Sequence, residues 1–440
     1  MPTLASLYPA HLQTLRTRVD QALQAAGFDA IAIHSGRSWM QFLDDQSYPF
    51  KVNPHFKAWL PLTDAPDCWI LYQSGQQPRL IFLQPDDYWH QPPTLPDGYW
   101  ATHFSIAVIR DAAEAKAHVT RLANCALIGE WQAEYADWGF AEGNPKTLLD
   151  HLHYHRAIKT EYELECMRLA SVRGARGHKA AAAAFRAGAA EYEIHLAFLH
   201  GTGHTDNELP YPDIVALNTH AAVLHYQHLD RQAPQQLRSF LIDAGAQVAG
   251  YASDITRTYS NDAGEFQALL DGMEQLQLEL CTQVRPGVDY ASIHLDAHRR
   301  IAELLRASDV ISMNAEDAVA CGLSGIFFPH GVGHLLGLQV HDVAGFSIDP
   351  QGRHQPRPTG HPYLRLTRTL QPGFVVTIEP GLYFIDSLLE QARQGPHARQ
   401  INWKQVERFR PYGGIRVEDD VACTQAEPEN LTRAAFACRS

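Results

Sequence analysis

The chain has 440 residues, more than one ordinary hydrophobic core accommodates, so we expect two domains. Hydrophobic residues make up 45% and charged residues 19%, as in folded soluble proteins, and a formal net charge of -13 argues against nucleic-acid binding. Seven cysteines without C-x-x-C spacing, no secretory signal at the N-terminus and no apolar stretch of about 18 residues predict a cytoplasmic protein with no membrane partner.

The first third of the chain alternates between helical and strand-like patterns. A helical spacing of Leu and Val runs from Leu12 to Ala26, and Gly27 is placed to end it. This alternation predicts an N-terminal α/β domain, which we place at residues 1–157. The short apolar runs that predict its strands are Ala30–Ile33, Trp69–Tyr72, Leu80–Leu83 and Ala126–Ile128.

A long helix is predicted at the start of the second domain, residues 158–440. Thr160 and Glu163 have the spacing of a capping box, and we expect the helix to end near Arg173, before Gly174. The alanine-rich residues that follow either continue this helix or form another. Hairpins and glycine-rich turns come next, with helices near 262–284 and 290–307.

Two aspartates in short β-prone runs are the first chemical signal. Asp243 and Asp254 flank a predicted hairpin turn at Ala246–Gly250, and folding the chain about its midpoint sets them opposite each other on antiparallel strands. Two adjacent anions among apolar residues require a compensating cation or proton. Alone, the pair is equally compatible with aspartates that are salt-bridged or hydrogen-bonded to turns.

A glycine-rich segment with three histidines strengthens the interpretation as a functional site. His330, His334 and His341 lie among three glycines, which let the backbone approach a ligand closely. The segment matches neither a His-Glu-x-x-His helix nor a dinucleotide fingerprint. A single histidine is more often a structural hydrogen-bonding residue, whereas three together favour a functional role.

Two glutamates in apolar strands complete the constellation. Glu379 lies in the middle of one β-prone run, and Glu418 follows Arg416 on the same face of another. Four carboxylates carry a charge of about -4, which two divalent cations neutralise. Four carboxylates and one imidazole suit Mn²⁺, Co²⁺ or Mg²⁺ better than a structural zinc site. Two such cations activate water near neutral pH and polarise a carbonyl, which predicts a hydrolase.

These segments, in this order, resemble the metal-dependent pita-bread hydrolases, which include prolidases, aminopeptidases P and methionine aminopeptidases. Residues 42–61, 208–218 and 361–365 are similar to bacterial Xaa-Pro dipeptidases (prolidases), a branch that includes organophosphorus acid anhydrolases. The resemblance covers nearly the whole chain. It implies an α/β N-terminal domain followed by an α+β pita-bread catalytic domain. It also implies that a hydroxide bridging two divalent metal ions hydrolyses Xaa-Pro dipeptides, with organophosphorus esters as promiscuous substrates.

The resemblance also implies roles for individual residues. The implied metal ligands are Asp243, Asp254, His334, Glu379 and Glu418. The implied catalytic residues are Glu379 as a proton relay, together with His225, His330, His341 and Arg416. The implied substrate-binding residues are Arg368 at the substrate carboxylate, Arg365 as a weaker candidate, and Tyr211, Leu224, Tyr290 and Leu364 as pocket walls. Asp45 matches a loop that reaches into a partner subunit's site, which implies a homodimer.

Several alternatives stay open at this point. Manganese is the expected metal, with cobalt or zinc as alternatives, because availability often decides which ion occupies such a site. An internal salt bridge from Arg416 to Glu418 or Asp419 competes with its substrate role, and each proposed pocket wall is by itself more often plain core. Rival functions are an aminopeptidase P, a dedicated organophosphorus acid anhydrolase, and a non-catalytic binding protein on the same fold.

Overall fold

The computed structural model describes residues 3–438, which divide into two compact units. Unit 1 extends up to Cys166 and includes the short segments Ala249–Tyr251 and Ser347–Arg353; the rest of the chain forms unit 2. The domain boundary at 157/158 stays a prediction. All seven cysteines lie in the described part of the chain and are free thiols. No helix among the described residues is long and apolar enough to cross a membrane.

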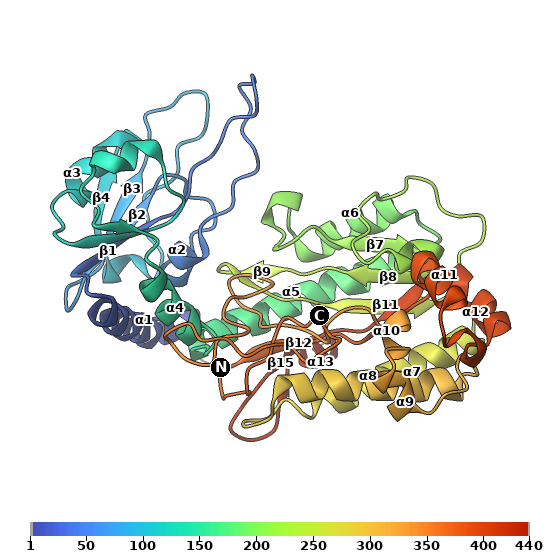
Figure 1. Cartoon of the computed structure of the whole chain (residues 1–440). Coiled ribbons are helices and arrows are strands. Elements are labelled where there is room, and N and C mark those ends of the chain that lie inside the picture. The colour runs from blue at the N-terminus through green and yellow to red at the C-terminus, as the bar shows by residue number, and fades with distance from the viewer. Residues whose placement is uncertain (1–2, 439–440) are drawn as a thin grey trace. The chain divides into compact units, whose positions relative to one another are not determined.

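Unit 1 is built on a six-stranded mixed sheet with the order β4-β3-β2-β1-β5-β6 (Figure 1). Strand β1 pairs antiparallel with β2 and parallel with β5. Each of the four runs predicted as strands forms one. The strands are β1 (Ala30–His34), β2 (Trp69–Gln73), β3 (Arg79–Leu83), β4 (Ser105–Ile109), β5 (Cys125–Ile128) and β6 (Glu142–Gly143).

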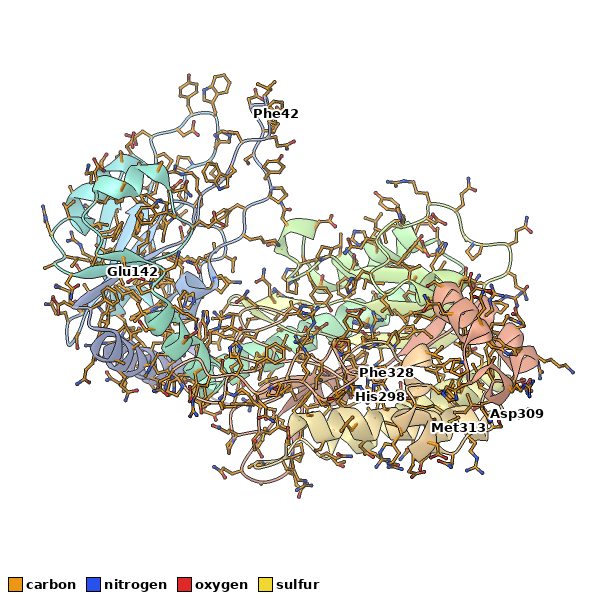
Figure 2. All side chains as sticks on the ribbon, in the orientation of Figure 1. Phe42, Glu142, His298, Asp309, Met313 and Phe328 are labelled. Carbon is orange, nitrogen blue, oxygen red and sulfur yellow. The ribbon has the colours of Figure 1, made fainter. Side chains whose placement is uncertain are left out.

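The helices of unit 1 begin with α1 (Leu4–Ala26), which ends as predicted. Gly27 adopts a left-handed conformation with φ 79°, and its N–H donates to the carbonyl of Leu23 at 2.8 Å. Phe42 and Leu43 lie between β1 and α2, where they are 86% and 91% exposed (Figure 2). The other helices are α2 (Pro54–Trp59), α3 (Lys116–Val119) and α4 (Lys146–Arg156), with 3₁₀ turns η1 (Ala101–His103), η2 (Ala112–Ala115) and η3 (Ala133–Asp137).

Helix α5 (Glu161–Arg186) is a single long helix. The predicted capping box is confirmed, because the Thr160 N–H donates to Glu163 Oε2 at 2.7 Å and the Glu163 N–H donates to Thr160 Oγ1 at 3.4 Å. The predicted end near Arg173 is wrong. A Cβ on Gly174 would lie 3.0 Å from the Ser253 hydroxyl, so this glycine provides room for close packing and does not stop the helix.

In unit 2, helices α5 and α6 cover one face of a three-stranded sheet with the order β11-β8-β7 (Figure 1). Phe185 of α5 and Phe198 of α6 pack with Phe240 and Ile242 of β8 in one buried cluster. The elements are α6 (Glu191–Thr202), β7 (Ile214–Leu217), β8 (Ser239–Asp243) and β11 (Thr256–Ser260), with the short segments η4 (Asp206–Glu208), η5 (Asn218–Ala222), β9 (Gln247–Val248) and β10 (Tyr251–Ala252).

A second layer of strands in unit 2 joins the first through a bridge between Thr256 and Glu418. Helices α7 (Glu265–Cys281) and α8 (Tyr290–Ala307) pack together, and they fall within the two predicted helical ranges (Figure 1). The strands are β12 (Val375–Ile378), β15 (Asp419–Ala422) and β16 (Glu429–Asn430) in one sheet and β13 (Gly381–Tyr383) and β14 (Gly414–Arg416) in another. The remaining helices are α9 (Ala315–Ala320), α10 (Ser324–Phe327), α11 (Asp386–Gln394), α12 (Trp403–Phe409) and α13 (Leu431–Ala437), with η6 (Ala398–Gln400) and η7 (Arg410–Tyr412).

Candidate metal centre and active site

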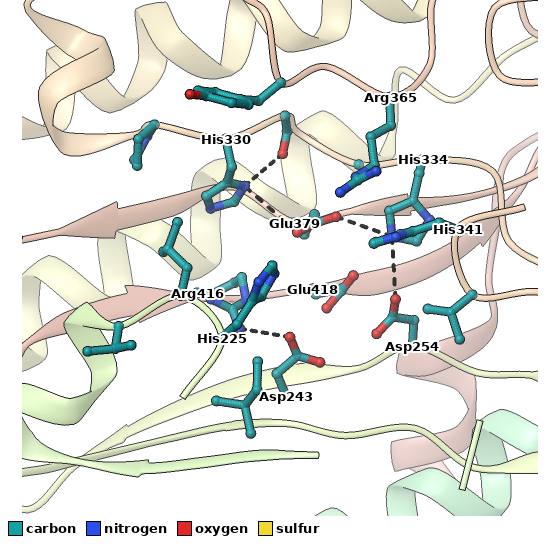
Figure 3. Close-up of a pocket in the computed structure, with 18 of the residues that line it drawn as sticks. His225, Asp243, Asp254, His330, His334, His341, Arg365, Glu379, Arg416 and Glu418 are labelled. Atoms are coloured by element: carbon teal, nitrogen blue, oxygen red, sulfur yellow. Dashed lines mark hydrogen bonds and ion pairs between the residues drawn. The ribbon is translucent and has the colours of Figure 1, made fainter. Parts of the chain in front are cut away.

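A pocket in unit 2 brings together most of the residues that the sequence singled out (Figure 3). Its walls come from segments spread between residues 211 and 418. The five predicted metal ligands all line it, and so do the predicted catalytic residues. These lining residues are Asp243, Asp254, His334, Glu379, Glu418, His225, His330, His341 and Arg416.

The two aspartates reach the pocket through a strand register that differs from the predicted one. Asp243, at the end of β8, pairs with Thr256 and not with Asp254, which lies just before β11. A shift of two residues keeps a side chain on the same face of a sheet, so both carboxylates still point to one side. The Tyr211 hydroxyl donates to Asp243 Oδ1 at 2.9 Å and to Asp254 Oδ1 at 2.5 Å.

The glycine-rich segment presents His334 to these carboxylates. Gly333 has φ 151°, and a Cβ there would lie 2.2 Å from the Thr377 carbonyl oxygen, so only glycine allows this close approach. The His334 N–H donates to Thr377 Oγ1 at 3.1 Å, and its Nδ1 lies 3.0 Å from a backbone carbonyl. Its Nε2 therefore faces Asp254 Oδ2 and Glu379 Oε1, each 3.4 Å away.

Glu418 has the environment of a metal ligand. Thr256 Oγ1 donates to Glu418 Oε2 at 2.6 Å, whereas Glu418 Oε1 is buried with no hydrogen-bond partner among residues 3–438. Asp254, His334 and Glu418 each offer a ligand atom, and these atoms lie within 4.8 Å of one another. A buried carboxylate oxygen without a donor is satisfied by a cation, so the residues fit a divalent metal.

The pKa values of the carboxyl groups also indicate that the site suits a cation. Burial, reinforced by neighbouring carboxylates, raises the pKa of Glu379 to about 7 and also raises the pKa of Asp243 and of Glu418. Burial alone would raise the pKa of Asp254 too, but the hydrogen bond and charge of His334 hold it below its usual value. Burial next to like charges therefore opposes the ionisation of Glu379, Asp243 and Glu418, and a bound cation would remove that cost.

Arg416 is held by an ion pair that the sequence did not predict. Its Nη2 donates to Asp243 Oδ2 at 2.7 Å, and its Nη1 donates to the Tyr383 hydroxyl at 2.8 Å. Arg416 thus forms an internal salt bridge, as the alternative predicted, but its partner is Asp243 and not Glu418 or Asp419. Asp419 pairs instead with Arg257 at 2.7 Å.

The predicted substrate-binding residues separate into two groups. Tyr211, Leu224 and Arg365 line the pocket, whereas Arg368, Tyr290 and Leu364 are not among the described residues that do so. All three are buried, and for Tyr290 and Leu364 this agrees with the alternative of plain core. The Arg368 guanidinium lies 4.7 Å from the centroid of the Phe374 ring, and the Tyr290 hydroxyl donates to the Thr377 carbonyl at 2.6 Å. Asp45 belongs to unit 1.

Several supporting residues were missed from the sequence. Thr256 and Thr377 each lie two positions from a predicted ligand, and this spacing puts them on the ligand's face of the strand. The alternation of side chains along a strand could therefore have identified both threonines from the sequence. No sequence pattern identifies Tyr383 and Asp420 as supporting residues, because their contacts come from distant segments. The Asp420 carboxylate accepts the backbone N–H of Asp254, at 3.1 and 3.2 Å.

Comparisons with known proteins identify the family of the chain. Residues 6–154 match the family "Xaa-Pro dipeptidase, N-terminal domain", and residues 165–425 match "Metallopeptidase family M24". The Xaa-Pro dipeptidase of Xanthomonas campestris pv. campestris (strain 8004) is 54% identical over 438 residues, covering 99% of each chain. That of Stenotrophomonas maltophilia (strain K279a) is 52% identical over 434 residues, covering 98% of each.

Solved structures support the fold. Escherichia coli aminopeptidase P with the inhibitor Pro-Leu superimposes with a TM-score of 0.74 at 21% identity, covering 96% of this chain and 95% of that one. Proline aminopeptidase P II from Yersinia pestis gives a TM-score of 0.71 at 23% identity, covering 96% of each chain. The predicted fold class, an α/β domain followed by a pita-bread catalytic domain, is confirmed. The chain belongs to metallopeptidase family M24, in the branch of the bacterial Xaa-Pro dipeptidases.

Proposed function

We propose that the protein hydrolyses Xaa-Pro dipeptides and that Asp243, Asp254, His334, Glu379 and Glu418 hold two divalent cations for this reaction. The relatives that match over 99% of the chain are named for this activity, and family M24 is metal-dependent. The observation that carries the proposal is the buried carboxylate cluster with its unsatisfied Glu418 oxygen. When bound, the cations supply Lewis acidity and lower the pKa of water toward neutrality.

Glu379 is the proposed proton relay. A carboxylate beside the reacting groups is a common general base and acid, and burial already raises the pKa of Glu379 to about 7 in the metal-free protein. Its Oε2 lies 3.8 Å from Nδ1 of His330. In the proposed role, Glu379 would take a proton from the attacking water and pass it to the leaving amine of proline.

The pocket histidines are proposed to stabilise the oxyanion and steer protons. Burial, followed by the charge of His334, lowers the pKa of His341 to about 4, so its imidazole is neutral and retains one N–H. His330 has both ring nitrogens engaged, Nδ1 at 2.8 Å from the Gly331 carbonyl and Nε2 at 2.9 Å from the Tyr383 hydroxyl, so its proposed role is to steer protons. His225 lines the same pocket. Groups preorganised in this way stabilise developing charge with little rearrangement.

Arg365 is the proposed partner of the substrate's C-terminal carboxylate. It lines the pocket and is exposed, whereas Arg416 is engaged with Asp243 and Tyr383. A guanidinium binds a carboxylate through two parallel hydrogen bonds, which favours a dipeptide over a longer chain.

A kinetic panel tests the proposed substrate class. Purified protein loaded with Mn²⁺, Co²⁺ or Zn²⁺ is assayed with Ala-Pro, with a tripeptide that carries proline second and with paraoxon. The highest kcat/KM is expected for Ala-Pro. A preference for the tripeptide would assign the chain to aminopeptidase P activity, and a preference for paraoxon would assign it to organophosphorus hydrolysis.

Substitution of Arg365 tests the binding role. Arg365→Ala should raise KM for Ala-Pro about tenfold or more, with a smaller change in kcat, because it removes uniform binding of the carboxylate. Arg306→Ala, an exposed arginine at the end of α8, is the matched control and should leave KM unchanged. An unchanged KM in Arg365→Ala would reject this role.

The proposal has three further parts. Manganese is the proposed activating metal, because four of the five ligands are carboxylates. The protein is proposed to act in the cytoplasm as a homodimer in which the loop around Asp45 contributes to the partner's site. Hydrolysis of organophosphorus esters is proposed as a side reaction, because a tetrahedral phosphorus centre resembles the intermediate of amide hydrolysis.

A further inference from the structure

Three histidines form a compact group that is separate from the metal pocket. His294 and His298 lie one turn apart on α8, and His361 comes from a loop more than sixty residues later in the chain. Each offers a ring nitrogen, and these atoms lie within 4.8 Å of one another. The ring centroids are 4.7, 4.7 and 4.6 Å apart. None of the three is among the described residues that line the pocket.

The neighbours of these rings set their orientation. His298 Nδ1 lies 3.0 Å from the Ser324 hydroxyl, which leaves Nε2 for another partner. The Phe328 ring packs on His298 at 4.7 Å between centroids (Figure 2). His294 Nε2 lies 2.9 Å from His361 Nδ1, while His294 Nδ1 is buried with no hydrogen-bond partner in the described part of the chain.

The group has the electrostatics of metal-binding imidazoles. Burial, followed by the nearby histidines, lowers the pKa of His294 to about 2 and that of His298 to about 3. Within residues 3–438, no carboxylate forms a salt bridge with any of the three. The His294 and His298 rings therefore stay neutral at physiological pH, and burial also lowers the pKa of His361. The neutral imidazole is the form that binds a metal.

We propose that His294, His298 and His361 form a second metal site that binds one zinc-like divalent ion through three imidazoles. Histidines at i and i+4 present their rings on one face of a helix, which is a common arrangement for two ligands of one ion. His361 is half-buried, which leaves access and a fourth coordination position for water. A nitrogen-only site selects borderline ions such as Zn²⁺ over Mn²⁺, which prefers the carboxylates of the pocket.

A hydrogen-bonded histidine network is the alternative. It accounts for the contact between His294 and His361, but it leaves the buried Nδ1 of His294 and the mutual crowding of three rings unexplained. The other described cluster outside the pocket differs in this respect. Glu191 there accepts hydrogen bonds from Leu217, His220, Tyr226 and Asp230, so its carboxylate is already satisfied.

Phe328 connects the proposed site to a residue of the catalytic pocket. The Phe328 ring is 4.7 Å from that of His298 and 4.9 Å from that of His330, between centroids. His330 in turn lines the pocket. One aromatic ring therefore separates the proposed zinc ligands from a histidine of the active site.

Metal stoichiometry in the full-length protein tests the proposal. Protein saturated with Mn²⁺ is dialysed against buffered micromolar Zn²⁺, and bound metals are counted by mass spectrometry. His361→Gln and His298→Gln should each bind one zinc ion fewer per chain than the wild type. His200→Gln, an exposed histidine on α6, is the matched control and should bind as many as the wild type. Equal zinc content in wild type and both site variants would overturn the proposal.

A second measurement separates this site from the pocket. The variant Asp254→Asn/Glu418→Gln lacks two of the proposed pocket ligands, so it should retain one Co²⁺ with nitrogen ligation, seen as visible d–d absorption. Adding His361→Gln should abolish that absorption. Loss of pocket metal with retention of this ion supports the site even if the proposed peptidase activity fails. Absorption that survives His361→Gln would refute it.

Discussion

Single residues of the pocket show why a cation belongs there. Glu418 has one oxygen bonded to Thr256 and the other buried without a donor among the residues that the structure describes, and an unsatisfied buried acceptor costs about 1–3 kcal/mol. Asp243 accepts hydrogen bonds from Arg416 and Tyr211, and only the arginine brings a compensating positive charge. The cluster is therefore organised for a charge that the protein's own side chains do not fully supply.

This organisation predicts that metal affinity rises with pH. The pKa of Glu379 is about 7 in the metal-free protein, and the pKa values of Asp243 and Glu418 are also raised, so cations must displace protons to bind. Affinity for Mn²⁺ should increase between about pH 5 and pH 8, with proton release on binding. Calorimetry in two buffers of different ionisation enthalpy measures that release. Glu379→Gln should release fewer protons, and a pH-independent affinity would contradict the prediction.

At the scale of secondary-structure elements, the packing of the 330–342 segment against β12 positions the only imidazole of the proposed ligand set. The backbone N–H of Thr377 donates to the His334 carbonyl at 3.0 Å, and the N–H of Glu379 donates to the Val332 carbonyl at 2.8 Å. Two ligands are thus positioned by one run of backbone contacts, which is possible only because Gly333 has no side chain.

Gly333→Ala should therefore damage both stability and metal binding. The added Cβ would meet the Thr377 carbonyl oxygen at 2.2 Å, and such overpacking costs about 1–3 kcal/mol. Displacement of His334 should also lower metal occupancy. Gly325→Ala, where a Cβ meets no described atom within 4 Å and φ is not positive, should change stability by only about 0.5 kcal/mol. Denaturant unfolding and metal analysis measure the two effects, and equal behaviour of the variants would count against this role.

The ion pairs between His195 of α6 and two aspartates that precede β7 predict that the stability of the protein depends on pH. His195 Nδ1 lies 2.8 Å from Asp213 Oδ2, and its Nε2 lies 3.0 Å from Asp206 Oδ1. The hydrogen bond to Asp213 raises the pKa of His195 above its unfolded value of 6.5. The resulting stabilisation is complete below that value and is lost as the pH rises through the raised pKa.

The stability difference between the wild type and His195→Gln should accordingly shrink as the pH rises from about 6 to about 9. Thermal midpoints at several pH values measure it. His200→Gln, on the same helix but exposed, should show no such trend. A difference for His195→Gln that grows with pH would reverse the sign and refute the assignment.

At the scale of the whole molecule, the exposed loop of unit 1 bears on the proposed homodimer. Phe42 and Leu43 are 86% and 91% exposed, and neighbouring apolar side chains that protrude in this way commonly mark an interface (Figure 2). Phe42→Ser/Leu43→Ser should weaken self-association at least about tenfold, measured by sedimentation velocity. Leu95→Ser, at a residue of unit 1 that is 55% exposed, is the control. A wild-type protein that sediments as a monomer would exclude the dimer.

Local patterns by themselves determined much of this protein. The end of α1 at Gly27, four of the six strands of unit 1 and the Thr160 capping box follow from spacing and backbone preference within a few residues, and each is confirmed. The residue types of the proposed metal ligands could also be predicted from the sequence, because a carboxylate inside an apolar strand requires a cation, a proton or a hydrogen-bond donor wherever it occurs. The family followed from motifs that are each local.

Only the tertiary structure decided which residues meet. The ion pair between Arg416 and Asp243 and the burial of Arg368 depend on contacts between segments far apart in the chain, and the pairing of Asp243 with Thr256 depends on the strand register. The approach of His361 to α8 is of the same kind. The periodicity of the sequence predicts which face of its helix or strand a side chain occupies. It does not predict which distant element packs against that face, because this depends on how the whole chain folds.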